Sequence, residues 1–128
     1  MRIDVVPTVS VNEVEFGMDR KQVRLLLGKA KEFRKSQYAE NTTDDFGFCH
    51  VFYDTDDKCE AIEIFDEAEV YVDGKLIFPT DLNSAMKIIN DFEHDDDGLT
   101  SYSLSIGIYA PDDEPESILI GIKGYYDE

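Results

Sequence analysis

The chain has 128 residues, of which 42% are hydrophobic, with eight Phe and seven Tyr, and this composition predicts one folded domain and not a disordered chain. The 29 Asp and Glu residues against 12 Lys and Arg residues give a formal net charge of -17, which disfavours binding to nucleic acid or to an anionic membrane and favours a basic partner. No apolar run is long enough to span a bilayer, and the N-terminus lacks the apolar region of a signal peptide, so we expect a cytoplasmic protein.

The N-terminal part of the chain is predicted to form two short strands and a short helix. The strands fall at residues 2–6 and 8–14, and the helix at residues 19–27. Asp19 is the expected N-cap, with Gln22 completing a capping box, and Gly28 ends the helix because glycine tolerates the left-handed conformation found there. The face expected to be buried is made by Val23, Leu26 and Leu27. The face expected to lie in water carries Arg20, Lys21 and Arg24.

The middle of the chain is predicted to form two hairpins. Residues 29–38 fit either a strand around Phe33 or a loose extension of the helix, and residues 39–45 are expected to form a loop. The first hairpin joins strands at 46–53 and 58–65 through an acidic turn at 54–57. The second, very short hairpin spans residues 69–78 around the Asp73-Gly74 pair, which is a strong signal for a two-residue hairpin turn.

The C-terminal part is predicted to contain a second helix, an acidic loop and a last hairpin. The helix spans residues 81–92, because apolar residues recur there with helical spacing. The loop spans residues 93–98. The last hairpin joins strands at 101–110 and 116–124 through an acidic turn at 111–115.

The segments before the two helices share a layout. Phe16-Gly17-Met18-Asp19 aligns with Phe78-Pro79-Thr80-Asp81, and each is followed by a helix and then by a hairpin with an acidic turn. This similarity indicates possible half-repeats, 16–77 and 78–128, within a single domain of residues 1–128; the alternative is that every helix needs a cap and a stop. Both interpretations predict an α+β, two-layer fold, with one antiparallel sheet of hairpins and helices on one face.

A resemblance to known families adds to this prediction. Gly17-Met18-x4-Val23-x2-Leu26-Leu27-Gly28 resembles the G-M-x4-V-x2-L-L-G signature of the BamE/SmpA-like and β-lactamase-inhibitor-protein-like domains. That resemblance implies a small α+β unit, sometimes in tandem. In its length, acidity and aromatic-rich C-terminal strand, the whole chain is similar, more loosely, to the small acidic immunity proteins of bacterial polymorphic toxin and contact-dependent inhibition systems.

No catalytic residues and no cofactor are predicted. Cys49 and His50 are neighbours in a strand, so their side chains point to opposite faces and cannot form a nucleophile–base pair. Cys49 and Cys59 are expected to be small buried side chains without a disulfide bond. The acidic segments 54–57 and 95–98 could hold a hard cation, although neither fits the EF-hand spacing. Basic residues within 20–35 could form a nucleic-acid patch, which the acidic remainder of the surface would oppose.

The favoured interpretation is a non-catalytic acidic binding protein, specifically an immunity protein that neutralises a basic, nuclease-type bacterial toxin by docking on it. Its expected contact residues are the turn carboxylates and nearby aromatic anchors, namely Asp54, Asp56, Asp57, Asp95, Asp96, Asp97, Asp112, Asp113, Glu114, Tyr53, Tyr109, Tyr125 and Tyr126. Tyr102 is either a further anchor or a core residue. If the repeat is real, we expect the turns at 54–57 and 111–115 to lie at the same end of the sheet.

The alternative interpretation is a small metal-binding or enzymatic α+β domain that uses the acidic loops. The oligomeric state is expected to be a monomer or a weak dimer, since the short hairpin at 69–78 could present an exposed edge strand to a second copy.

Overall fold

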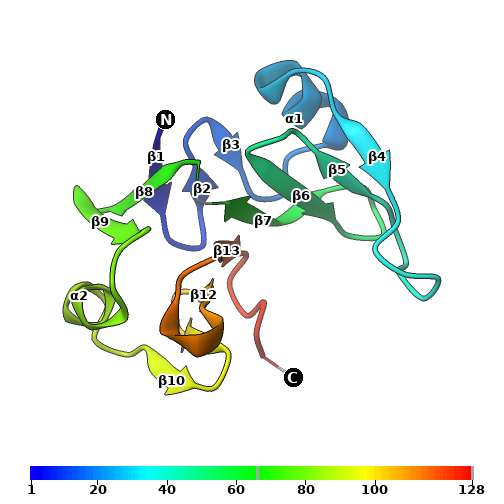
Figure 1. Ribbon diagram of the computed structural model, residues 1–128. Helices are drawn as coiled ribbons and strands as arrows, with labels where there is room; N and C mark the ends of the chain where they lie inside the picture. The colour runs from blue at the N-terminus through cyan, green and yellow to red at the C-terminus, as the bar shows by residue number, and fades with distance from the viewer. Residues whose placement is uncertain (66, 128) are drawn as a thin grey trace.

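The computed structural model describes residues 1–65 and 67–127 and shows a mixed α/β structure that consists mainly of β-strands (Figure 1). The elements of the first half, in chain order, are β1 (Arg2–Val6), β2 (Ser10–Val11), β3 (Val14–Glu15), α1 (Arg20–Leu27), β4 (Lys31–Phe33), β5 (Thr43–Asp45), β6 (Cys49–Tyr53) and β7 (Cys59–Phe65). Those of the second half are β8 (Glu69–Val72), β9 (Lys75–Phe78), α2 (Leu82–Ile88), β10 (Glu93–Asp95), β11 (Gly98–Ser101), β12 (Ile106–Tyr109), the 3₁₀ turn η1 (Pro111–Asp113) and β13 (Ser117–Gly121). Within residues 1–65 and 67–127, neither helix has the length and apolar character needed to cross a membrane.

The strands form two sheets, so the prediction of one antiparallel sheet is wrong. A five-stranded sheet has the order β3-β2-β1-β8-β9, and an eight-stranded sheet has the order β10-β11-β12-β13-β7-β6-β5-β4. Within the five-stranded sheet β1 runs parallel to β8, with Ile3 opposite Val70. Alternation of apolar residues predicts that each segment is a strand, but it does not indicate which distant strand becomes its neighbour.

The eight-stranded sheet consists of two four-stranded meanders. One follows α1 and contains β4 to β7, and the other follows α2 and contains β10 to β13. The last strands of the two meanders, β7 and β13, pair antiparallel at the centre of the sheet, with Ile62 opposite Ile120. The hairpin of β8 and β9 lies between the meanders in sequence and belongs to the other sheet. A duplication of 16–77 and 78–128 stays a prediction.

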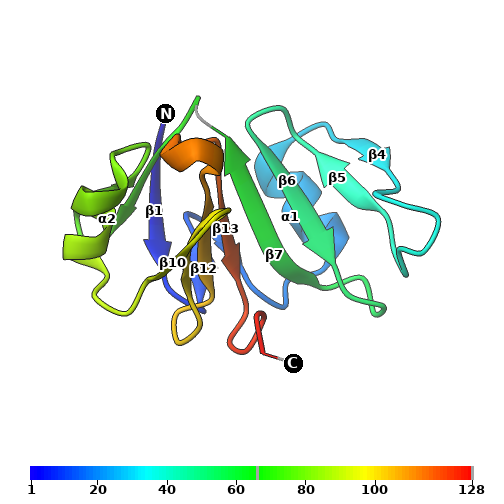
Figure 2. The same cartoon turned by 60° about the horizontal axis from the view of Figure 1, so that its bottom comes forward.

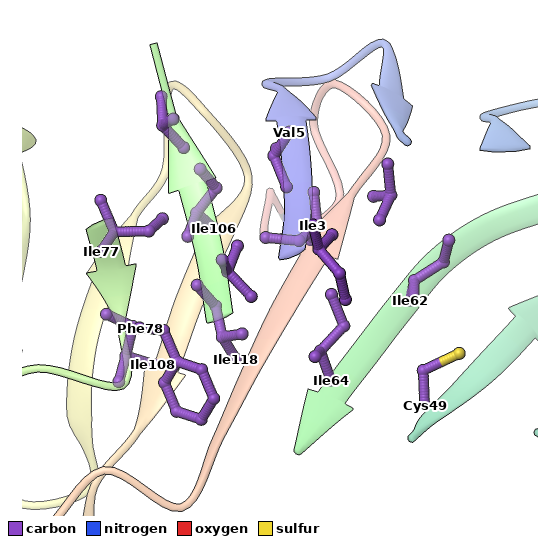
Figure 3. Packing of buried hydrophobic residues seen from close by; sticks show 14 of the residues in the cluster. Ile3, Val5, Cys49, Ile62, Ile64, Ile77, Phe78, Ile106, Ile108 and Ile118 are labelled. Atoms are coloured by element: carbon purple, nitrogen blue, oxygen red, sulfur yellow. The ribbon is translucent and has the colours of Figure 1, made fainter. Parts of the chain in front are cut away.

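The hydrophobic core lies between the two sheets (Figure 3). Isoleucines from β7, β12 and β13 cover one face of the eight-stranded sheet and are fully or almost fully buried. Ile3 of β1 and Ile77 and Phe78 of β9 pack against them from the five-stranded sheet, each with no exposed surface. Removal of these side chains from water is the main force that holds the sheets together.

Helix α1 begins and ends where the sequence predicts, but its N-terminus is held differently. Asp19 occupies the N-cap position, and Gly28 ends the helix with a φ of 96°. The Asp19 carboxylate makes no capping hydrogen bond and instead pairs with Lys58, so the predicted capping box is wrong. The backbone N–H of Arg20 donates to the carbonyl of Asp57, which ties the start of α1 to the turn between β6 and β7.

The buried face of α1 differs from the predicted one. Val23 is fully buried, whereas Leu26 is 42% exposed and Leu25 is 85% exposed. Arg20, which was expected to face water, is 7% exposed. The helix therefore packs on the sheet partly through a charged side chain, which requires a partner for that charge inside the protein.

Helix α2 is shorter than predicted. The Asp81 carboxylate accepts a hydrogen bond of 2.8 Å from the backbone N–H of Ser84, as expected of an N-cap, but the helix ends at Ile88 and does not extend to Phe92. Helices α1 and α2 lie far apart in both views (Figures 1 and 2), with α2 beside β9 at one end and α1 near β6, and the predicted packing of helices as one layer on one face is not confirmed.

Three segments differ from their predicted conformation. The expected acidic loop after α2 contains the edge strand β10, and part of the expected loop at 39–45 is the strand β5. The single strand predicted at 101–110 is interrupted by a turn at 102–105, which separates β11 from β12. For residues 29–38, a strand and an extension of the helix were both predicted as alternatives. The strand is the one observed, since Lys31–Phe33 forms β4.

Candidate interaction site

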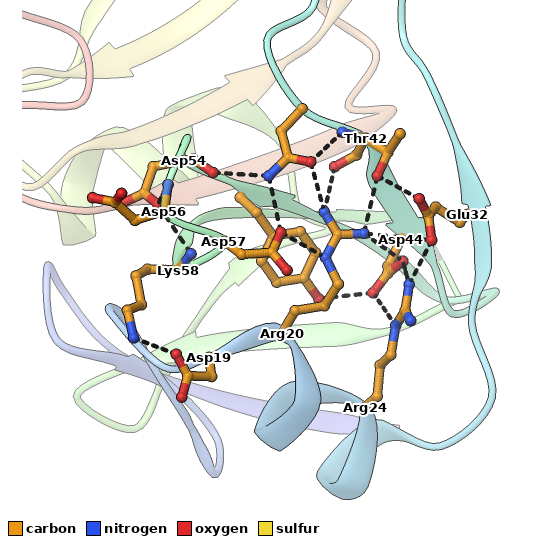
Figure 4. Close-up of polar contacts among 12 residues, drawn as sticks. Asp19, Arg20, Arg24, Glu32, Thr42, Asp44, Asp54, Asp56, Asp57 and Lys58 are labelled. Atoms are coloured by element: carbon orange, nitrogen blue, oxygen red, sulfur yellow. Dashed lines mark hydrogen bonds and ion pairs between the residues drawn. The ribbon is translucent and has the colours of Figure 1, made fainter.

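A buried carboxylate lies at the centre of a charge network beneath α1 (Figure 4). Asp44 of β5 has no exposed surface. Its carboxylate accepts hydrogen bonds from Arg24 Nε at 2.8 Å, Arg24 Nη2 at 2.6 Å, Arg20 Nη1 at 3.3 Å and the Tyr53 hydroxyl at 2.9 Å. The prediction that Arg20 and Arg24 only face water is therefore wrong. Two guanidinium groups and a hydroxyl replace the water that a buried carboxylate loses.

The environment of this network keeps its members in their usual charge states. Burial acts to raise the pKa of Asp44, but the hydrogen bonds from Arg24 and Tyr53 outweigh that effect and hold the pKa below its ordinary value. Burial, followed by the hydrogen bond to Asp44, raises the pKa of Tyr53 above its ordinary value. At neutral pH the carboxylate is ionised and the phenol is neutral, so the network positions α1 and has no group poised for proton transfer.

The remaining donors of Arg20 bind the loop before β5 and the turn after β6. Arg20 Nε donates to the Asp57 carboxylate at 2.9 Å, and Arg20 Nη2 donates to the Asn41 side chain at 3.1 Å. Arg24 Nη2 also pairs with Glu32 at 3.0 Å. Hydrogen bonds from Thr42 and Arg24 lower the pKa of Glu32. Because carboxylates pair with both arginines, the basic stretch 20–35 offers less free positive charge than its sequence suggests, and a nucleic-acid patch loses support.

The turn between β6 and β7 uses most of its carboxylates to hold its own structure. Asp54 Oδ1 accepts hydrogen bonds from the backbone N–H groups of Asp56 and Lys58, at 2.9 and 3.0 Å. Asp57 accepts from Arg20, as described above. The Asp56 carboxylate makes no hydrogen bond or ion pair with residues in the described ranges, so it is the member of the three predicted contact residues that remains available to a partner.

Tyr53 is not a surface anchor. Its side chain is 5% exposed, its hydroxyl donates to Asp44, and the Arg20 guanidinium lies 4.1 Å from the centre of its ring. The prediction for this residue is wrong because alternation along β6 places Tyr53 on the same face as Val51, toward α1 and the core.

The second group of predicted acids is brought together by the fold. Gly98 lies opposite Tyr109, and the backbone N–H of Ala110 donates to the carbonyl of Asp97 at 2.7 Å, so the turn before β11 lies beside η1. His94 Nε2 lies 3.0 Å from Asp113 Oδ1 and links β10 to η1. We call the resulting set of exposed carboxylates the acidic cluster, and its members are Asp95, Asp96, Asp97, Asp112, Asp113 and Glu114.

The acidic cluster carries little compensating positive charge. No Lys or Arg occurs in the sequence from residue 88 to residue 122, whereas Asp and Glu occur there nine times. Asp95 Oδ1 accepts from the backbone N–H groups of Asp97 and Gly98 and so stabilises the turn. The other carboxylates of the cluster, apart from Asp113, make no hydrogen bond or ion pair within residues 1–65 and 67–127.

The two acidic turns lie at opposite ends of the eight-stranded sheet, so the prediction of one shared end is wrong. Strand β13 runs antiparallel to β7, with Ser117 opposite Phe65 and Gly121 opposite Ala61. The turn at 111–115 precedes β13 and therefore lies beyond the end of β7, whereas the turn at 54–57 lies beyond its start. The acids thus form one exposed cluster and one separate turn that is largely bonded internally.

Tyrosines lie along the face of the eight-stranded sheet that points away from the core, which we call the open face. Tyr109, which is opposite Gly98, lies beside the acidic cluster, whereas Tyr125 packs on Gly121 toward the other end of the strands. Tyr109 is 49% exposed, and Tyr125 and Tyr126 are half-buried. Tyr126 packs over Gly107, and burial raises its pKa. Tyr102 is 48% exposed and contacts Tyr126 edge-to-face with a centroid distance of 6.2 Å, so it belongs to the surface and not to the core. The alternation of buried and exposed residues along a strand does not apply to Tyr102, because Tyr102 lies in the turn between β11 and β12.

The two cysteines do not form a reactive site. Cys49 and Cys59 are buried free thiols, and burial raises the pKa of each to about 12. A thiol with that pKa is almost fully protonated at neutral pH and is a weak nucleophile. His50 lies on the opposite face of β6, where it contacts Phe33 and Phe65.

The metal-binding alternative gains no support from the side-chain arrangement. Within residues 1–65 and 67–127, no group of three or more His, Cys, Asp or Glu side chains has the geometry to hold a metal ion. The acids of the two loops are exposed, bonded to backbone N–H groups or paired with cations, as described above.

No family model matches the chain, no curated protein matches it, and no solved structure matches it. The resemblances to BamE/SmpA-like domains and to immunity proteins therefore stay predictions from the sequence.

Proposed function

We propose that the protein is a non-catalytic acidic binding protein that docks on a basic protein partner, as an immunity protein does when it neutralises a nuclease-type bacterial toxin. Nucleases carry positive charge because their substrate is a polyanion, and an inhibitor of opposite charge gains both association rate and specificity from that charge.

The acidic cluster is the observation that carries this proposal. Two segments that are separated in sequence contribute six exposed carboxylates to one end of the sheet, beside the exposed Tyr109. Repulsion within such a cluster disfavours the folded state. Because the cluster makes the folded state less stable, we expect its charge to have a function. A positively charged partner would relieve the repulsion.

The proposal is tested by co-purification with the tagged full-length chain, expressed in the cells that make it. We expect a basic protein to be retained at low salt and released at high salt, because exposed ion pairs are screened by salt. The test variant removes four carboxylates of the cluster that make no hydrogen bond within the described ranges, and it is D96N/D97N/D112N/E114Q. A control variant removes the same charge from exposed acids away from this end of the sheet, and it is E13Q/E15Q/E40Q/D73N.

The proposed function requires that the test variant lose the partner and that the control variant keep it. Retention that is equal in both variants, or the absence of any basic protein at low salt, would contradict docking through the acidic cluster. If the co-purified partner is a nuclease, its activity is measured with and without the added protein. The proposed function predicts that this activity falls when the protein is added.

A further inference from the structure

An open groove of about 340 Å³ crosses the open face of the eight-stranded sheet, next to the acidic cluster. Its floor follows a row of residues that lie opposite one another on neighbouring strands. Gly107 of β12 is at the middle of the row, between Thr100 of β11 and Leu119 of β13, and Glu63 of β7 follows Leu119. Residues that are directly opposed in an antiparallel sheet point to the same face, so these four positions line one surface.

Tyrosine side chains border this groove, and a glycine in its floor makes room for one of them. A Cβ atom at Gly107 would overlap the hydroxyl of Tyr126, so the absence of a side chain there lets the C-terminal Tyr126 fold over the sheet. Tyr109 lies two residues along β12 from Gly107, on the same face. The two rings lie among the lining residues together with the apolar side chain of Leu119.

Carboxylates lie at two sides of the groove. Glu63 comes from β7, and its Oε2 accepts a hydrogen bond of 2.8 Å from the Ser117 hydroxyl. Asp95, the last residue of β10, and Asp97 of the turn after it lie at the other side. The lining contains no Lys, Arg or His. A ligand that fits must therefore combine a positive charge with a flat or apolar portion that can lie against tyrosine.

We propose that this groove binds one arginine side chain of the basic partner, an inference that rests on the proposed function. The guanidinium group is planar, stacks on aromatic rings, and donates paired hydrogen bonds to carboxylates. Its aliphatic stem packs on Leu119, and Glu63 is its principal anionic contact. In this proposal the groove on the open face recognises one side chain specifically, and the adjacent acidic cluster attracts the partner over a longer range.

The test uses the tripeptide Ac-Gly-Arg-Gly-NH2 as the probe and the same peptide with citrulline in place of arginine as the neutral control. The probe is titrated into the ¹⁵N-labelled full chain, and amide chemical shifts are followed. We expect saturable shifts at Gly107 and Leu119 with the arginine peptide and none with the citrulline peptide, because citrulline has nearly the same shape without the charge.

Two pairs of variants make the result specific. E63Q keeps an oxygen that can accept from Ser117, so the fold is retained while the charge is lost, and we expect about tenfold weaker binding of the arginine peptide. E13Q removes the same charge from an exposed position on the other sheet and is expected to bind as the wild type does. Y126F is expected to bind normally and Y126A more weakly, since the ring and not the hydroxyl forms the wall.

Shifts that do not saturate, that spread equally over the turn at 54–57, or that are the same with citrulline would overturn the proposal, as would equal binding by E63Q and E13Q. Its failure is distinguishable from failure of the proposed function. If the acidic-cluster variant loses a basic partner while E63Q keeps it, the groove is refuted and the function stands. If the arginine peptide binds as expected and no basic protein co-purifies, the groove stands and the function is refuted.

Discussion

Replacement of Asp44 by Ala tests the charge network beneath α1. The Asp44 carboxylate is fully buried and accepts hydrogen bonds from Arg24, Arg20 and Tyr53. In the variant the Tyr53 hydroxyl and one donor of Arg20 lose their acceptor inside the protein. Removal of one partner from a buried ion pair costs about 3–5 kcal/mol. Arg24 is 38% exposed and can be hydrated, and Arg20 keeps bonds to three other side chains, so we expect about 3 kcal/mol, the lower end of that range.

Urea unfolding at neutral pH, followed by far-UV circular dichroism, measures this loss as a change in the free energy of unfolding. The matched control is Asp4→Ala, because Asp4 forms an ion pair with Arg2 in which the side chains are 55% and 59% exposed. Exposed ion pairs contribute about 0–1 kcal/mol, so the control is expected to lose no more than that.

The same carboxylate predicts a pH dependence. The pKa of Asp44 is lower in the folded chain than its ordinary value of 3.8, so its ionised form stabilises the folded state at any pH above that value. This stabilisation is lost as the pH falls below 3.8 and through the folded-state pKa. Asp44→Asn lacks this titration, and its stability is therefore expected to fall less steeply in acid than that of the wild type.

The reasoning is refuted if Asp44→Ala loses no more stability than Asp4→Ala. It is also refuted if the wild type and Asp44→Asn lose stability in parallel between pH 5 and pH 2. Either result would mean that the carboxylate is hydrated, or that its bonds to the two arginines do not offset the cost of its burial.

The remaining predictions concern a cap, the thiols and the core. Asp81→Ala should lose about 1 kcal/mol in urea unfolding because Asp81 caps α2, and a loss no greater than that of Asp19→Ala, which removes only an exposed ion pair, would contradict the assignment. Cys49 and Cys59, with pKa values of about 12, should not react with Ellman's reagent until the protein unfolds; rapid reaction of the native protein would show that they are accessible. Ile118→Ala should lose about 2–5 kcal/mol, and a loss near zero would place this side chain outside the core.

Local sequence patterns predicted the elements that depend on near neighbours. The hairpin around Asp73-Gly74 and the end of α1 at Gly28 follow from backbone conformations that these residues favour, and both are confirmed. The edge strand β10 was missed because its residues are Glu93, His94 and Asp95, which resemble a solvated loop. Charged residues are common on edge strands, where they discourage pairing with another chain.

Long-range pairing is what the sequence could not predict. The segments predicted at 29–38 and 39–45 separate the arginines of α1 from Asp44 in sequence. The residues near Arg20 therefore gave no indication that its side chain would point inward. Strand β5 offered no signal either, because its three residues are all polar and the neighbours Thr43 and Asp44 are both buried. Likewise, the opposite placement of the two acidic turns follows only from the antiparallel pairing of β7 with β13.

Docking through the acidic cluster is tested most directly by the affinity for a purified basic partner as a function of salt concentration. Wild type, D96N/D97N/D112N/E114Q and E13Q/E15Q/E40Q/D73N should be measured side by side. The proposed function predicts an affinity that falls as salt rises for the wild type and the control, and a weaker affinity with a smaller salt dependence for the cluster variant. An affinity that does not depend on salt, or an equal loss in both variants, would contradict it.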